Sequence, residues 1–204
     1  MIYEFRTYTL QPRTQPEFLK LFGEKLPKRL EFSRLVAFWT TEIGPLNQVI
    51  HVWEYENLVE RARIRAEVVK AGIWPPQTQE FIVEMKSDIL EPLPFSPPLG
   101  PSSHGPWFEM RTYTMKAGGI PIIAAGWKEH LPNRLKLSPL IGVFASDIGA
   151  LNTWVHIWAY KSLDERVAVR KKAVELGVWP PPGGSPTVKQ ETKMLLAAPF
   201  SPIT

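Results

Sequence analysis

The chain opens with alternating side chains. Residues 2–10 place Glu4, Arg6 and Tyr8 on one face of an extended segment and Tyr3 and Phe5 on the other. Two further stretches, 35–43 and 49–56, are rich in β-branched and aromatic residues and are joined through G-P-L-N, which is typical of a hairpin turn. A fourth strand is expected near residues 80–90. The pattern predicts a four-stranded sheet in the first half of the chain.

A helix is predicted between the first two strands. Thr14, followed three residues later by Glu17, has the spacing of a capping box, and the helix should run to about residue 33. Pro27 should kink or split it, because proline supplies no amide hydrogen and clashes with the preceding turn.

A second helix is predicted after the hairpin, because Asn57 and Glu60 have the spacing of a helix start. Gly72 suits its C-terminal end, where glycine adopts the left-handed conformation readily. The resulting order is strand, helix, strand, strand, helix, strand, which is that of a ferredoxin-like module.

The whole pattern occurs twice. A shift of 105 positions, which places residue 4 on residue 109, aligns the two halves over their full length without a gap. The repeated motifs are E-x-R-T-Y-T, L-P-x-R-L, I-G-x-L-N, H-x-W-x-Y, W-P-P and P-F-S-P. We therefore predict a module at residues 1–99, a Pro/Gly/Ser-rich linker at 100–106 and a second module at 107–204, whose last strand lies near 187–196.

The duplication answers a packing problem. A four-stranded sheet with both helices on one side leaves its other face uncovered, and a second copy can cover it. The predicted fold is therefore α+β, with two tandem ferredoxin-like βαββαβ modules whose antiparallel sheets pack face to face as an α+β barrel. Edge strands also make a homo-oligomer possible.

Composition narrows the function classes. The 204 residues include no cysteine, which excludes disulfides, thiolate nucleophiles and zinc-thiolate sites. The net charge of +4 is spread along the chain, whereas nucleic-acid binding usually requires clustered basic residues. No apolar stretch is long enough to cross a membrane, and no signal peptide is evident. We expect a cytoplasmic protein that binds neither nucleic acid nor membrane.

The five ordered motifs that precede P-F-S-P resemble those of the NIPSNAP family, over almost the entire chain and in both copies. The resemblance implies a dimeric α+β barrel module, but little about a reaction. Related barrels include cofactor-free monooxygenases, muconolactone isomerase-like enzymes and haem-binding proteins, which is an analogy at the level of fold.

The third strand of each copy carries the most chemistry. His51, Trp53 and Tyr55 share one face, and Ile50 and Val52 share the other. We expect the aliphatic face to pack against the helices and the His-Trp-Tyr face to look into the barrel, together with Glu4, Arg6 and Tyr8. The second copy repeats this set as His156, Trp158, Tyr160, Glu109, Arg111 and Tyr113.

These residues have a functional and a structural interpretation. In the first, His51, His156, Tyr8 and Tyr113 act as general acid or base, the arginines and glutamates bind an anionic or carbonyl group, and the tryptophans and Tyr55 and Tyr160 contact the ligand. In the second, Glu4 and Arg6 form a buried ion pair, and the histidines and tyrosines satisfy hydrogen bonds. Both interpretations account for the retention of the set in both copies.

Neighbouring residues favour structural roles. Arg29 and Arg134 follow L-P and are expected to cap carbonyls freed by the proline kink, with a guanidinium pointed at the end of the sheet as the alternative. Trp74 and Trp179 are expected to anchor the entry to the fourth strand. The chain has no H-x-x-x-H pair, P-loop or G-x-G-x-x-G, so we expect no metal and no cofactor; haem on His51 or His156 stays an analogy with related barrels.

Our leading hypothesis is a barrel pocket, without bound metal, that binds or transforms a small apolar, aromatic or carbonyl-bearing molecule. The alternative is a non-catalytic scaffold or interaction protein with a packed interior. The second copy has Val143-Phe144 where the first has Phe38-Trp39, and P-G-G-S at residues 182–185. The smaller aromatics predict a larger space in the second copy.

Overall fold

The computed structural model describes residues 1–181 and 186–204. Its first half forms four strands, two α-helices and one short 3-10 helix in the predicted order. The elements are β1 (Ile2–Leu10), α1 (Gln15–Leu30), β2 (Leu35–Ile43), β3 (Gln48–Tyr55), α2 (Leu58–Lys70), η1 (Gln79–Phe81) and β4 (Ile82–Pro92). The predicted βαββαβ order is confirmed.

The second half repeats this order. Its elements are β5 (Trp107–Met115), α3 (Gly119–Arg134), β6 (Leu140–Ile148), β7 (Thr153–Tyr160), α4 (Leu163–Glu175) and β8 (Thr187–Ala197). The P-G-G-S segment at residues 182–185 lies outside the described residues.

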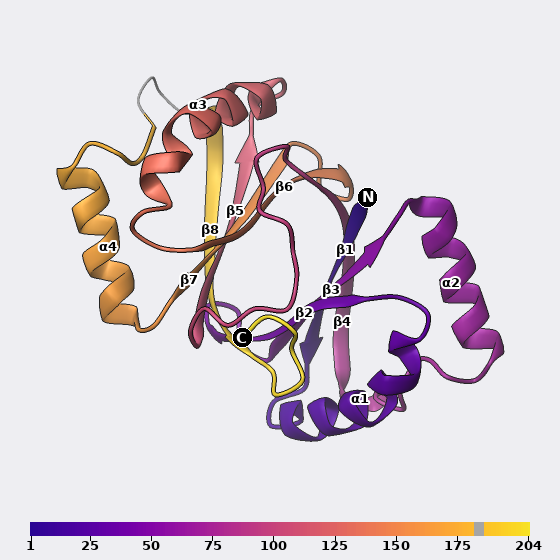
Figure 1. Cartoon of the computed structure of the whole chain (residues 1–204). Coiled ribbons are helices and arrows are strands. Elements are labelled where there is room, and N and C mark those ends of the chain that lie inside the picture. Colours follow the sequence, from indigo (N-terminus) through magenta and orange to yellow (C-terminus); the bar gives the residue numbers. More distant parts are fainter. Residues whose placement is uncertain (182–185) are drawn as a thin grey trace.

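The eight strands close into one antiparallel barrel in the order β1-β3-β2-β8-β5-β7-β6-β4. Each module contributes four consecutive strands, and the modules meet where β2 pairs with β8 and β4 with β6. Helices α1 and α2 lie on one side of the barrel, and α3 and α4 on the other (Figure 1). The predicted α+β barrel of two sheets is confirmed.

The aliphatic face and the His-Trp-Tyr face of β3 lie on the opposite sides of the sheet from those we predicted. Ile50 and Val52 lie inside the barrel, in a cluster that draws on both modules and includes Phe5, Phe108 and Phe144. The His-Trp-Tyr face of β3 packs instead under α1 and α2; the Trp53 ring, for example, belongs to the cluster of Phe18, Phe22 and Ile64. The expectation that these residues look into the barrel was therefore wrong.

The physical reason is that both faces of this sheet are buried. Alternation shows which side chains share a face, but it does not show which face meets the helices when both faces are covered. The interior takes mainly aliphatic and phenyl groups from all strands, although it also contains Trp39 and Tyr3, whereas most of the buried tryptophans lie on the helix side.

The predicted cap of Asn57 is confirmed and recurs at Ser162 in the second copy, whereas the predicted cap of Thr14 is not formed. Asn57 Oδ1 accepts the N–H of Glu60 at 2.9 Å, and Ser162 Oγ accepts that of Glu165 at 3.0 Å. Thr14 makes no cap, because its hydroxyl donates to the carbonyl of Gln11. Helix α1 also continues through Pro27 to Leu30, so the proline does not split it.

The P-F-S-P segments cross between the modules. Phe95, from the first half, packs with the helix-side cluster of the second, and Phe200, from the second half, packs with that of the first. Ser201 Oγ accepts the N–H of Phe38 at 2.9 Å, and Ser96 Oγ accepts that of Val143 at 3.0 Å. Each module thus completes the helix-side core of the other.

Candidate functional site

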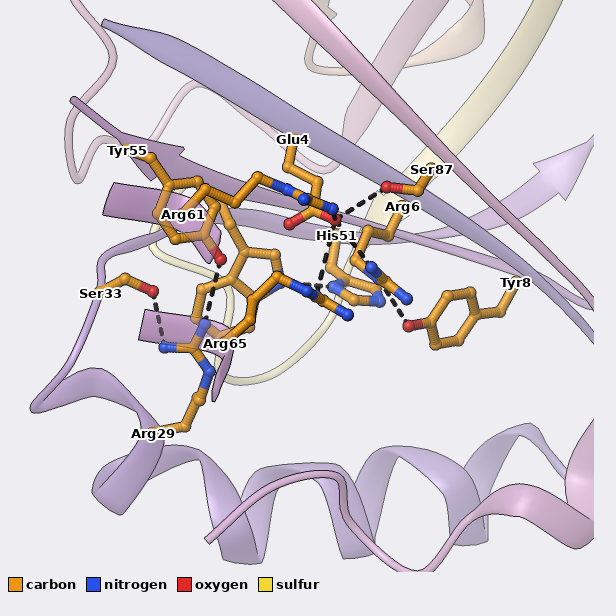
Figure 2. Close-up of polar contacts among 11 residues, drawn as sticks. Glu4, Arg6, Tyr8, Arg29, Ser33, His51, Tyr55, Arg61, Arg65 and Ser87 are labelled. Atoms are coloured by element: carbon orange, nitrogen blue, oxygen red, sulfur yellow. Dashed lines mark hydrogen bonds and ion pairs between the residues drawn. The ribbon is translucent and has the colours of Figure 1, made fainter. Parts of the chain in front are cut away.

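A buried carboxylate organises the polar residues of the first module. Oxygen Oε1 of Glu4 accepts hydrogen bonds from Arg6 (2.7 Å), Arg61 (2.6 Å) and Ser87 (2.8 Å), and the guanidinium of Arg65 lies 3.6 Å away. The dashed contacts in Figure 2 converge on Glu4 from β1, β4 and α2. Three arginines therefore surround one carboxylate.

These contacts determine the charge of Glu4. Burial raises the pKa of a carboxyl group, but the hydrogen bond from Arg61, the charge of Arg6 and the hydroxyl of Ser87 outweigh it and leave the pKa of Glu4 at about 2. The second copy is arranged likewise, with Arg166 Nη2 2.6 Å and Arg111 Nη1 3.0 Å from Glu109 Oε1, and its carboxyl pKa is also lowered. Both glutamates are ionised at neutral pH.

The histidines lie beside these clusters with a fixed orientation. The indole Nε1–H of Trp53 donates to Nδ1 of His51 at 2.7 Å, and that of Trp158 to Nδ1 of His156 at 2.8 Å. An indole can only donate, so Nδ1 must be the acceptor and the neutral ring carries its proton on Nε2. Burial, followed by the charges of nearby arginines, lowers the pKa of both histidines well below the usual value. Each ring is therefore a neutral Nε2–H donor.

That donor has no internal partner. Nε2 of both histidines is buried and makes no hydrogen bond to any described residue, although His51 and His156 are only 1% and 2% exposed. An unpaired buried N–H is unfavourable and calls for an explanation such as a ligand.

Arg29 and Arg134 do not cap helix carbonyls, contrary to our prediction. Arg134 donates to the hydroxyls of Ser138 and Tyr160, and its guanidinium lies 4.1 Å from the centroid of the Trp158 ring. Arg29 makes the equivalent contacts with Ser33, Tyr55 and Trp53. Each guanidinium stacks on a tryptophan ring of the sheet, which directs it away from the carbonyl groups of its own helix. Within the described chain, no carboxylate lies within ion-pair distance of either arginine.

A cavity of about 440 Å³ opens beside this cluster in the second module. It lies between α4 and the sheet, outside the barrel. Its cationic lining residues are Arg111, Arg134, Arg170 and Lys171, and its aromatic ones are Tyr113, His156, Trp158, Tyr160 and Trp179. Among the described residues that line it there is no carboxylate.

Three substitutions between the copies shape this cavity. Ala173 stands where the first module has Val68, Lys171 where it has Ala66, and Gln190 where it has Met85. The Val143-Phe144 pair, from which we predicted extra space, does not line the cavity; Val143 packs in one cluster with Trp127 and Trp154, which replace Phe22 and Val49.

The predicted site residues assemble as two separate sites. Each half brings its Glu, Arg, Tyr, His, Trp and Tyr together on the helix side, so the two sets do not share one barrel interior. Sequence reasoning missed Arg61, Arg65, Arg166 and Arg170. Their signal was an R-x-x-x-R pair on the second helix of both copies, one helical turn apart and therefore on one face. Trp179, which we expected to have a structural role only, also lines the cavity.

Two negative findings apply to residues 1–181 and 186–204. None of the helices there combines the length and the apolar character that a membrane crossing requires. No three histidine, aspartate or glutamate side chains come together in a way that could hold a metal ion.

The chain is similar in sequence to proteins of one family. The NIPSNAP family profile matches residues 3–97 and again 108–202. Human protein NipSnap homolog 3A is 33% identical over 182 residues, which cover 86% of this chain and 73% of that protein. A Dictyostelium discoideum NipSnap homolog is 32% identical over 186 residues, covering 87% and 78% respectively.

A likeness of fold extends further. A crystal structure of a candidate monooxygenase from Fusobacterium nucleatum superposes with a TM-score of 0.66, over 97% of this chain and 92% of that one. The identity is 10%, so this likeness concerns the fold alone. By the two profile matches and the relatives above, the chain belongs to the NIPSNAP family and carries two consecutive NIPSNAP domains.

Proposed function

We propose that this protein binds a small organic anion with an aromatic or apolar body in the cavity between α4 and the sheet of the second module. The observation that carries the proposal is the charge of the lining: four cationic side chains, one unpaired histidine N–H and no carboxylate among the described lining residues. The cavity differs in place from the barrel pocket that the sequence suggested.

The positive charge of the lining is neutralised only in part, although Arg170 lies 3.7 Å from Glu109 and Lys171 lies 3.7 Å from Glu175. Glu109 accepts from Arg111 and Arg166, but it does not line the cavity, and Arg134 is 3% exposed without a carboxylate partner among the described residues. A buried cation is strongly stabilised by a counter-charge that it can reach. A ligand carboxylate or phosphate would supply that charge.

Neutral donors would orient the anion. His156 offers Nε2–H, and the hydroxyl of Tyr113 accepts from Arg111 Nε at 2.7 Å, which leaves its own proton to donate. Burial raises the pKa of the Tyr113 hydroxyl, so it stays protonated. In this proposal His156 is a donor rather than a base. The same donors would stabilise negative charge developing on a carbonyl oxygen if the ligand is transformed.

Benzoate and its neutral isostere benzamide test the proposal by calorimetry. We expect the protein to bind benzoate and to discriminate against benzamide, and we expect Arg170→Gln to weaken benzoate binding about tenfold, as for loss of a charge-assisted hydrogen bond. Arg170 and its counterpart Arg65 are both partly exposed, at 45% and 38% of the side chain. Arg65→Gln is therefore a matched control and should leave binding unchanged.

Native mass spectrometry of gently purified protein covers anions other than benzoate. A retained small anion that disappears in Arg170→Gln would support the proposal and give its mass. Equal binding of benzoate and benzamide, or no anion in either experiment, would favour the scaffold function. The buried apolar cluster inside the barrel is also compatible with a scaffold.

A further inference from the structure

A second cavity lies on the opposite face of the sheet, at one mouth of the barrel. Its volume is about 290 Å³. Its lining includes the apolar residues Phe5, Leu90, Met110 and Val155, together with four threonines, Gln48 and charged residues of β4 and β8. The helix-side site plays no part in it, so the two cavities can be tested independently.

One lysine in this cavity differs from the others. Lys86 lies 3.3 Å from Glu84, and Lys189 lies 2.6 Å from Glu191, and both lysine side chains are well exposed. Lys193 is half-buried and has no carboxylate within ion-pair distance among the described residues. Its Nζ instead donates to the neutral Oε1 of Gln48 at 2.7 Å.

We propose that the amine of Lys193 is a nucleophile and that the barrel mouth takes a small aliphatic aldehyde, which Lys193 binds covalently as an imine. A neutral carbonyl compound suits a cavity whose rim carries charges of both signs, because neither sign repels it. The apolar residues below the rim provide room for a short carbon chain.

The charged groups around Lys193 come from two strands. Glu191 lies on the same strand, β8, and Lys86 and Asp88 face it from β4. Burial, with the charge of Lys86, lowers the pKa of Lys193 against the opposing effect of Glu191 and Asp88. Burial likewise raises the pKa of Asp88. The amine is therefore more often unprotonated, and the carboxyl more often protonated, than in water.

The reaction is a condensation without oxidation or reduction. The lone pair of Nζ attacks the carbonyl carbon, and a proton moves from nitrogen to oxygen to give a carbinolamine. In this proposal Asp88 donates a proton to the departing hydroxyl, so that the carbon–oxygen bond breaks and water leaves. The nitrogen of the resulting iminium then returns its remaining proton to Asp88. The product is a carbon–nitrogen double bond between the aldehyde carbon and Nζ, and one water.

Reductive trapping tests this proposal. The full-length protein is incubated with propanal and sodium cyanoborohydride at neutral pH, and the propylated lysines are located and timed by peptide mass spectrometry. We expect Lys193 to be trapped several-fold faster than Lys86 and Lys189, since a lowered pKa leaves a larger fraction of its amine unprotonated at neutral pH.

Three controls make the outcome decisive. Lys193→Arg keeps the charge and should remove the fast site while the other lysines react as before. Asp88→Asn should slow trapping at Lys193 alone. In urea-unfolded protein, Lys193 should fall to the rate of its neighbours. Trapping of Lys193 in the folded protein no faster than exposed Lys20, or equally fast after unfolding, would overturn the proposal.

Discussion

The imidazole of His156 is held by a neighbour two residues along its own strand. Trp158 fixes Nδ1 as an acceptor, and the buried Nε2–H has no hydrogen-bond partner among the described residues. His51 and Trp53 repeat the arrangement in a module whose matching wall positions are larger or apolar. Under the proposed function, the same pair of side chains serves packing in one half and binding in the other.

Nitrogen-15 NMR of the histidine rings measures this state directly. Because the pKa of His51 and His156 lies well below the usual value, we expect both rings to stay neutral, with the proton on Nε2, as the pH falls through 6.5. Trp158→Phe should release the tautomer of His156 and weaken benzoate binding several-fold, while Trp53→Phe affects only His51. Titration of either ring near its usual pKa would contradict this expectation.

Glu4 links the same cluster to acid stability. Its pKa falls from 4.5 to about 2 on folding, so the Glu4 contribution is complete above pH 4.5 and is lost as the pH falls towards 2. The shift corresponds to stabilisation on the order of 3 kcal/mol at neutral pH. Urea unfolding across this range should show a smaller acid-induced loss in Glu4→Gln, which is also less stable at neutral pH. An unchanged acid profile would argue against this role of Glu4.

At the scale of elements, helices α2 and α4 distinguish the walls of the two helix-side sites. Each helix follows the β-hairpin of its own module, carries an R-x-x-x-R pair and covers the equivalent face of the sheet. Ala173 on α4 is smaller than Val68 on α2, and Lys171 on α4 and Gln190 on β8 are more polar than Ala66 and Met85 in the first module.

Exchange of these three residues between modules should move the site. Lys171→Ala, Ala173→Val and Gln190→Met together are expected to reduce benzoate binding at least about tenfold by filling the cavity and removing a charge. The reciprocal change, Ala66→Lys, Val68→Ala and Met85→Gln, should create a second binding event per chain by calorimetry. Unaltered stoichiometry in both variants would show that other residues determine the difference.

Much of this element-scale picture follows from sequence. The strands, their order and the set of side chains that share a face with His51 were predictable, because alternation and the repeat report them directly. Which face meets the helices was not, because both faces are buried. The arginines of α2 and α4 were overlooked, since arginine on an amphipathic helix usually indicates a solvated surface.

At the scale of the whole molecule, the crossing P-F-S-P segments join the two cores. Gly23 faces Phe200 so closely that an added Cβ would lie 3.2 Å from its ring, and Phe200 stacks on Phe22 with centroids 5.8 Å apart. The halves should therefore unfold as one unit.

Truncation of either phenylalanine tests this coupling. Phe200→Ala and Phe95→Ala are each expected to lower the free energy of unfolding by about 2–4 kcal/mol, in line with the loss of a large ring from a core. Each P-F-S-P segment packs into the core of the other module. The unfolding transition should therefore remain single when it is followed by tryptophan fluorescence and by circular dichroism. Two separate transitions in either variant would show that the modules are independent.

The charged rim of the barrel has a consequence for how such a protein can evolve. Lys86 corresponds to Glu191 in the internal repeat, and Asp88 to Lys193, and all four line one cavity. In a barrel made of two identical chains, the two positions of each such pair would carry the same residue. Like charges would then face one another across the mouth of the barrel. Covalent fusion removes that constraint, because equivalent positions in the two modules can change independently. A lysine can therefore arise in one module and an aspartate at the equivalent position of the other.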